Sequence, residues 1–171
     1  MTKQTKRPMA PNVSVKELTH LDAETILQHL LRLNPYERYL RFGYSISSRS
    51  IKQLVAQHLS ERGSFFFGVF WDGALVGLCH IARSEPPGTA EVALSVDADF
   101  KDQGIAHSLM RHALEQAQRQ LYQSLLLSVL CANTAMLKSA AKFGFQIKVK
   151  MGQATGHLRI PRSTSDCALA D

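Results

Sequence analysis

The sequence has little cysteine, and its cysteines form no metal-binding pattern. It contains three of them in 171 residues, an odd number with no C-x-x-C pairing, so neither a disulfide framework nor a structural zinc site is expected. Cys79 and Cys131 lie in apolar runs that predict strands, where they would be small core residues. The seven histidines are scattered, and none has a ligand spacing such as H-E-x-x-H. We therefore expect no bound metal.

Long apolar runs are also missing. No apolar stretch approaches the roughly 20 residues needed to cross a bilayer, and the first residues lack the apolar segment of a secretory signal. A hydrophobic content of 45% and a charged content of 20% are ordinary for a globular protein. We expect a cytoplasmic protein with no membrane partner. Its length suits one domain, placed at residues 13–160 between a disordered basic arm (1–12) and a polar C-terminal tail (161–171).

Two familiar nucleotide-binding motifs and a nucleic-acid-binding signature are absent as well. Neither G-x-x-x-x-G-K-[ST] nor G-x-G-x-x-G occurs, which argues against a nucleoside triphosphatase and a dinucleotide-binding domain. The net charge of +6 comes from dispersed basic residues, so a nucleic-acid partner is not expected. A polyanionic cofactor or an acidic protein partner explains the basicity at least as well.

The most informative stretch joins a predicted strand to a predicted helix through a loop that contains Gly104. Residues 90–96 are rich in branched apolar side chains, which is typical of a strand. Beyond the loop, apolar residues recur with the spacing of one helical face, at Ile105, Leu109, Ala113, Leu114, Ala117 and Leu121. The first N–H groups of a helix lack partners within it and carry partial positive charge. This junction therefore predicts an anion site that suits phosphate.

Further predicted elements surround this junction. Asp72-Gly73 joins two apolar runs and is a strong hairpin signal. Asn133-Thr134 opens a helix through Ala141 that stops at Phe143-Gly144-Phe145. Strands are expected over residues 65–70, 74–81, 89–96 and 124–130.

The N-terminal third predicts one more strand and several helices. Residues 13–18 alternate like a strand. Helices are expected after the capping residues Asp22, Asn34 and Ser48. The first would turn Ile26, Leu27, Leu30 and Leu31 inward. The second has an acid, Glu37, at its third position and should end by Gly43, and the third should run to about residue 61.

The loop from Lys101 to Ala106 resembles the acetyl-CoA pyrophosphate loop of the GNAT superfamily of N-acetyltransferases, Q/R-x-x-G-x-G/A, with Lys at the first position instead of Gln or Arg. The element order over residues 65–149, roughly half of the chain, is similar too. The resemblance implies an α/β (α+β) GNAT fold. Such a fold has a central twisted, mixed but mostly antiparallel sheet of six to seven strands with a splayed parallel pair, flanked by about four helices. In motif style the chain is most similar to the GNAT domains of bacterial protein acetyltransferases.

The resemblance also implies a set of cofactor contacts, and acetyl-CoA is the expected cofactor. The backbone N–H groups of Leu94 and Val96 would pair with the pantetheine arm and the thioester carbonyl. The pyrophosphate would rest on the N–H groups of Gln103, Gly104, Ile105, Ala106 and His107, with Lys101 nearby. Asn133 matches an Asn that contacts the cofactor arm or an ordered water, although it could also be a plain N-cap.

Glu91 is the expected general base, because it is the only acid within the predicted catalytic strand and related enzymes carry a Glu at the matching place. The alternative is a solvated Glu at a strand end. On this strand Glu91, Ala93 and Ser95 would share one face. The tyrosine acid of many GNAT enzymes has no counterpart, since Ala140 occupies its position.

The segment 39–42 resembles the Arg-Phe signature of GNAT domains related to bacterial protein acetyltransferases. We nevertheless expect Leu40 and Phe42 to be core residues and Arg41 to be solvated.

The resemblance implies an N-acetyltransferase that moves an acetyl group from acetyl-CoA to a primary amine by direct attack in a ternary complex. The acceptor would be a small molecule or a protein lysine, and homodimerisation is left open. The alternative is a non-catalytic acyl-CoA-binding regulatory module of the same fold, for which the missing tyrosine is the best argument. A basic nucleic-acid-binding protein is the least favoured alternative.

Overall fold

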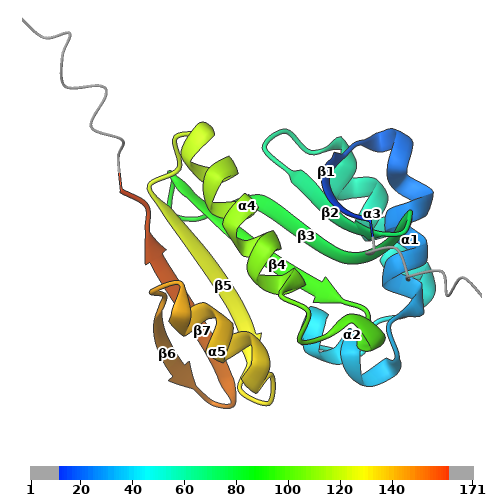
Figure 1. Cartoon of the computed structure of the whole chain (residues 1–171). Helices are drawn as coiled ribbons and strands as arrows, with labels where there is room; N and C mark the ends of the chain where they lie inside the picture. The colour runs from blue at the N-terminus through cyan, green and yellow to red at the C-terminus, as the bar shows by residue number, and fades with distance from the viewer. Residues whose placement is uncertain (1–11, 162–171) are drawn as a thin grey trace, which may run out of the picture.

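The computed structural model describes residues 12–161, which form one mixed sheet with helices on both faces (Figure 1). The expected basic arm, apart from residue 12, and the expected tail, apart from residue 161, lie outside the described residues. The strand order is β1-β2-β3-β4-β5-β7-β6. The strands are β1 (Val13–Leu18), β2 (Phe65–Trp71), β3 (Ala74–Ser84), β4 (Thr89–Val96), β5 (Ser124–Leu130), β6 (Gln146–Lys150) and β7 (Gln153–Arg159).

Only the β4–β5 pair is parallel among these neighbours, so the expected mixed and mostly antiparallel sheet is confirmed. The hairpin predicted at Asp72-Gly73 is confirmed as well: both residues have positive φ, 48° and 85°, as a tight hairpin turn requires.

Within residues 12–161, five α-helices cover the sheet, as the residue patterns predict, where the family resemblance implied about four. They are α1 (Ala23–Arg32), α2 (Pro35–Phe42), α3 (Ser48–Ser60), α4 (Ile105–Arg119) and α5 (Thr134–Lys142). One hydrophobic cluster joins α4 and α5 to one face of the sheet, and a second joins α1 and α3 to the other. No helix within residues 12–161 is both long enough and apolar enough to span a membrane.

The parallel strands β4 and β5 separate soon after they begin. Their pairing extends only from Thr89↔Ser124 to Glu91↔Leu126, whereas β5 continues to pair with β7 along its whole length. Figure 1 shows the two strands diverging beyond this point, as expected for the splayed pair. Residues 92–96 of β4 are therefore paired on the β3 side only.

Helix α4 packs closely onto the sheet because β3 has a glycine beneath it. A Cβ atom on Gly77 would lie 2.5 Å from Cγ2 of Ile105, a distance that real contacts do not show. The absence of a side chain at Gly77 thus lets the first turn of α4 sit directly against β3. This contact fixes the loop that precedes the helix.

Several expectations about the elements need correction. Asp22 precedes α1 but does not cap it: its carboxylate accepts from the backbone N–H of Thr19 at 2.8 Å, in the preceding turn. Ser47, not Ser48, caps α3 through Oγ. Leu121 is not on the inner face of α4, because the helix ends at Arg119 and the chain reverses through Leu121, which has φ 59° and is 81% exposed.

Three expectations about side chains also fail. Arg41 is not solvated: its Nε atom is buried, because α2 folds over β4 and β5. Leu40 and Phe42 are only partly buried. Cys131 lies in the turn after β5 rather than within the strand, although it does pack against the core, and Cys79 is a fully buried core residue as expected.

Candidate active site

The loop before α4 presents unpaired backbone N–H groups to solvent. The first backbone hydrogen bond of this helix runs from the N–H of Ser108 to the carbonyl of Gly104, at 3.0 Å. The N–H groups of residues 103–107 have no acceptor within residues 12–161. Asp102 and Gly104 both have positive φ, 61° and 76°, so the loop turns sharply enough to gather these groups at the helix N-terminus. Such an arrangement binds anions.

Lys101 does not direct its side chain toward these N–H groups. Its Nζ atom lies 2.6 Å from Oε1 of Glu37, at the start of α2. The other carboxylate oxygen of Glu37 accepts from the backbone N–H of Asn34 at 3.2 Å, which completes the predicted capping box. The Lys101 side chain therefore ties the loop to α2, so an anion at this helix N-terminus would be held by backbone N–H groups rather than by Lys101.

The free edge of β4 faces the gap between β4 and β5. The N–H of Asp97 donates to the carbonyl of Val76 on β3 at 2.8 Å. Because N–H groups alternate in direction along a strand, those of Leu94 and Val96 point the other way, toward the gap. The gap thus offers two donors in line with the loop. Their pairing with a cofactor stays a prediction.

A buried polar cluster anchors the end of β4 just before the loop. His29 of α1 is fully buried, with Nε2 at 2.9 Å from Oγ of Ser95 and Nδ1 at 3.1 Å from Oδ1 of Asp97. Arg32 donates to the other oxygen of Asp97 at 3.0 Å. Burial disfavours ionisation of Asp97, but the hydrogen bonds and charges of His29 and Arg32 outweigh it and keep its pKa below the usual value.

This Ser-His-Asp cluster is structural. A Ser, a His and an Asp in this order are also the groups of a hydrolytic triad, but none of these residues lines the cavity described below. No sequence pattern indicates this cluster, because His29 is far from Ser95 along the chain.

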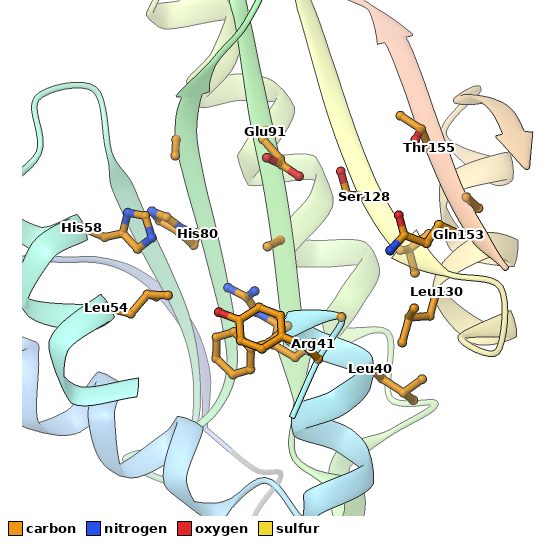
Figure 2. Close-up of a pocket in the computed structure, with 17 residues that line it drawn as sticks. Leu40, Arg41, Leu54, His58, His80, Glu91, Ser128, Leu130, Gln153 and Thr155 are labelled. Atoms are coloured by element: carbon orange, nitrogen blue, oxygen red, sulfur yellow. The ribbon is translucent and has the colours of Figure 1, made fainter. Parts of the chain in front are cut away.

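A cavity of about 340 Å³ lies at the gap between β4 and β5, beneath α2 and α3, and no residue of α4 or of the loop before it lines this cavity. Glu91 and Ala93 reach it from β4, and Ser128 reaches it from β5. Figure 2 shows the side chains of Glu91 and Ser128 pointing toward one another across the splayed strands. The cavity is lined by Leu40, Arg41, Phe42, Gly43, Tyr44, Leu54, His58, His80, Ala82, Glu91, Ala93, Ser128, Val129, Leu130, Gln153, Ala154 and Thr155. Glu91 is thus half-buried in a cavity rather than solvated at a strand end.

The cavity also holds basic side chains that the sequence did not indicate as site residues: Arg41, His58 and His80. Burial, together with the charges of Arg41 and His58, lowers the pKa of His80 to about 3, so this imidazole is neutral near pH 7. Its Nε2 lies 2.8 Å from Oγ of Ser64. Burial lowers the pKa of Arg41 only to about 10, so the guanidinium remains charged. In the sequence, the only indication that Arg41 belongs to the site was the resemblance of residues 39–42 to the Arg-Phe signature.

Asn133 lies where β5 turns into α5. Its Oδ1 accepts from the backbone N–H of Met136 at 3.1 Å, which confirms the plain N-cap interpretation. The cap uses the oxygen of the amide, so the nitrogen can still act as a donor. The side chain of His107, in the first turn of α4, reaches across to α5, with its ring centroid 4.7 Å from that of Phe143. The contact of Asn133 with a cofactor arm stays a prediction.

The structure offers no side-chain acid at the position where many GNAT enzymes have a tyrosine. Ala140 is fully buried in α5, with its carbonyl accepting from the N–H groups of Phe143 and Phe145.

Within residues 12–161, no three His, Cys, Asp or Glu side chains gather closely enough to hold a metal ion.

Comparisons with known proteins agree with this geometry. The model of the acetyltransferase (GNAT) family matches residues 26–145. An acetyltransferase of Pseudomonas aeruginosa is 29% identical over 139 residues, which cover 78% of this chain and 75% of that protein. The N-acetylaspartate synthetase of Rattus norvegicus is 31% identical over 112 residues, and the match spans 65% of this chain but only 36% of that longer protein.

The fold has solved counterparts. The GNAT domain of the S. lividans protein PAT superposes with a TM-score of 0.74 at 19% identity, over 88% of this chain and 96% of that domain. The match of the family model over most of the chain and the splayed β4–β5 pair lead to the same assignment. The chain belongs to the GNAT family of acetyltransferases.

Proposed function

We propose that this acetyltransferase moves the acetyl group of acetyl-CoA to a primary amine bound in the cavity between β4 and β5. One observation carries the proposal: the splayed strand β4 borders both the anion-binding loop and the cavity. Its unpaired N–H groups face the gap, and its residue Glu91 projects into the cavity. A cofactor held by its pyrophosphate at the loop and an acceptor in the cavity would therefore meet at β4.

The residues of the chain fit acetyl-CoA as the donor, which the family uses. The N–H groups of residues 103–107 would hold the pyrophosphate, and those of Leu94 and Val96 would hold the arm and polarise the thioester carbonyl. Asn133 would donate to the arm from its amide nitrogen. Bound there, acetyl-CoA supplies an activated acyl carbon.

Glu91 would act as the general base, directly or through a water molecule. The acceptor enters as an ammonium and loses one proton to Glu91. Its nitrogen then bonds to the acyl carbon while the carbon–sulfur bond breaks, and the second amine proton leaves with CoA as the thiol. Because Ala140 offers no acid, this second proton would pass from the acceptor nitrogen to sulfur within the ternary complex or through solvent.

A thiol-release assay over amines, polyamines, amino acids and lysine peptides, with acetylated products identified by mass spectrometry, tests the proposal. Aspartate belongs in the panel, because the longer relatives are named N-acetylaspartate synthetases. We expect acceptor-dependent release with one product per thiol. Tight binding of CoA without release on any acceptor would instead favour the non-catalytic acyl-CoA-binding module, which the missing tyrosine acid also suggests.

A further inference from the structure

Arg41 is the unusual residue of the cavity, because its donors are not used by the protein. Its Nε atom is buried and has no hydrogen-bond partner within residues 12–161. No carboxylate of these residues lies within ion-pair distance of its guanidinium, whose Cζ atom lies over the ring of Phe42, 5.0 Å from the ring centroid. A contact with an aromatic ring uses none of the N–H donors of the guanidinium.

The neighbouring arginines show what a structural role looks like in this region. Arg32 donates to the carbonyl of Leu75 at 2.6 Å and to Asp97 at 3.0 Å. Arg38 donates to two carbonyls that end α1. Both side chains join elements together, whereas Arg41 reaches into the cavity and joins nothing there. Figure 2 shows its guanidinium pointing toward the strands, in the space bordered by His80 and Glu91.

The cavity therefore holds one cation, Arg41, and one anion, Glu91. The charge of Glu91 favours the charged form of Arg41, but the two side chains do not lie within ion-pair distance. Glu91 is the only carboxylate among the lining residues, and His80 is neutral near pH 7. His58 directs Nδ1 to Glu61, at 2.9 Å, which lies outside the cavity lining. A half-buried cation without a hydrogen-bonded ion-pair partner is costly to desolvate, and a ligand anion between Arg41 and the strands would compensate it.

We propose that the acceptor is an amino acid, whose carboxylate pairs with Arg41 while its amine faces Glu91. The inference rests on the proposed function and names its substrate class. A guanidinium fork matches a carboxylate in a bidentate manner, and Glu91 complements the ammonium group. The cavity volume of about 340 Å³ lies at the small end of ligand pockets, which suits a free amino acid better than a folded protein surface. Ser128, Gln153 and Thr155 add neutral polar groups.

Pairs of acceptors that differ only at the carboxylate test this role. Each amino acid is compared with its α-carboxamide, which keeps the amine and side chain but loses the negative charge. Because an unmatched buried charge penalises the wrong substrate strongly, we expect kcat/KM to favour the acid on the order of 100-fold. Equal kcat/KM values for acid and amide would overturn the proposal, and peptides acetylated better than any free amino acid would do so too.

Variants assign the preference to one side chain. Arg41→Gln should bring the acid-to-amide ratio close to 1 by slowing the acid alone, and Arg41→Lys should keep part of the preference because the charge remains. Arg49→Gln is the matched control: Arg49 is exposed on α3 and does not line the cavity, so the ratio should stay at the parental value. An unchanged ratio in Arg41→Gln would refute the assignment. Arg41→Lys decides the matter if the Gln variant does not fold.

Calorimetric binding of acid and amide to the CoA-saturated protein separates this inference from the proposed function. Preferential, Arg41-dependent binding of the acid without any turnover would leave carboxylate recognition intact and refute acetyl transfer to these amines. Turnover of amines with no acid preference would refute only the role of Arg41. Binding of neither acid nor amide at millimolar concentration would refute the amino acid assignment.

Discussion

Replacing Gly104 by alanine is the sharpest test of the anion-binding loop. Gly104 has φ 76°, and a Cβ atom built on it meets nothing within 4 Å. The new methyl group would therefore occupy the open space before α4, where the pyrophosphate is proposed to lie. A left-handed non-glycine residue costs about 1–2 kcal/mol, so the variant is strained but should still fold.

Gly152 provides a matched control in the turn between β6 and β7. It has φ 79°, and a Cβ there also meets nothing within 4 Å. Gly104→Ala and Gly152→Ala should thus lose similar stability, roughly 2–8 °C in Tm at 2–4 °C per kcal/mol. Only Gly104→Ala should weaken binding of CoA and acetyl-CoA. Loss of one charge-assisted hydrogen bond of ~1.5–3 kcal/mol corresponds to a Kd raised roughly 10- to 100-fold.

Isothermal titration with CoA and thermal unfolding measure the two effects separately. A Gly104→Ala variant that folds and binds CoA as tightly as Gly152→Ala would show that the backbone of this loop does not hold the pyrophosphate. Equal loss of affinity in both variants would assign the effect to strain rather than to the site. In either case the cofactor would have to be placed elsewhere along the gap.

Further predictions concern titratable groups. Glu91→Gln should lower kcat by ~10²–10⁴-fold with unchanged acetyl-CoA affinity and partial recovery at high pH, where more amine arrives neutral; a parental pH–rate profile would refute the base. His80 has a folded pKa of about 3, below its unfolded value near 6.5, so between these values only the unfolded state binds the extra proton, and acidification destabilises the protein. His80→Gln should flatten this fall in the free energy of unfolding by up to about 1.4 kcal/mol per pH unit in urea unfolding, and parallel curves would contradict it. The lowered pKa of Asp97 stabilises the fold above the unfolded pKa near 4, so Asp97→Asn should cost ~1–3 kcal/mol at pH 7, with a deficit that shrinks below pH 4; a deficit independent of pH would argue for packing alone.

Features set by neighbouring residues could be predicted from the sequence. The capping box of Asn34 and Glu37 and the hairpin at Asp72-Gly73 depend on a few adjacent residues, and the structure has both. The start of α4 also depends on one residue, because Gly104 takes the positive φ that the chain needs where the loop turns into the helix. Of these positions, Glu37 and Gly104 belong to or contact the loop on which the cofactor prediction depends.

The cavity could not be predicted in the same way, because its walls come from distant parts of the chain. Arg41 reaches it only because α2 packs against β4 and β5, and His58 because α3 places its ring 4.3 Å from the ring of His80 on β3. The order β5-β7-β6 places the last strand between two earlier ones, so Gln153 and Thr155 line the cavity from β7. Periodicity places a side chain on the face of its own element but does not identify the element that packs against it. The solvated Arg41 expected from the sequence was wrong for this reason.

The proposed cofactor loop and the cavity meet at the point where β4 and β5 separate. Glu91 is the last residue of β4 that pairs with β5, opposite Leu126, and every later residue of β4 borders the gap. Strand alternation turns the side chains of Glu91 and Ala93 toward the cavity and leaves the N–H groups of Leu94 and Val96 in the plane of the sheet. A carbonyl held by those N–H groups would therefore lie between the α4 face, where the proposed pyrophosphate loop is, and the cavity that Glu91 and Arg41 line. One strand that loses its partner halfway along thus presents backbone N–H groups at its edge and a carboxylate on its face, which are the two groups that the proposed reaction requires.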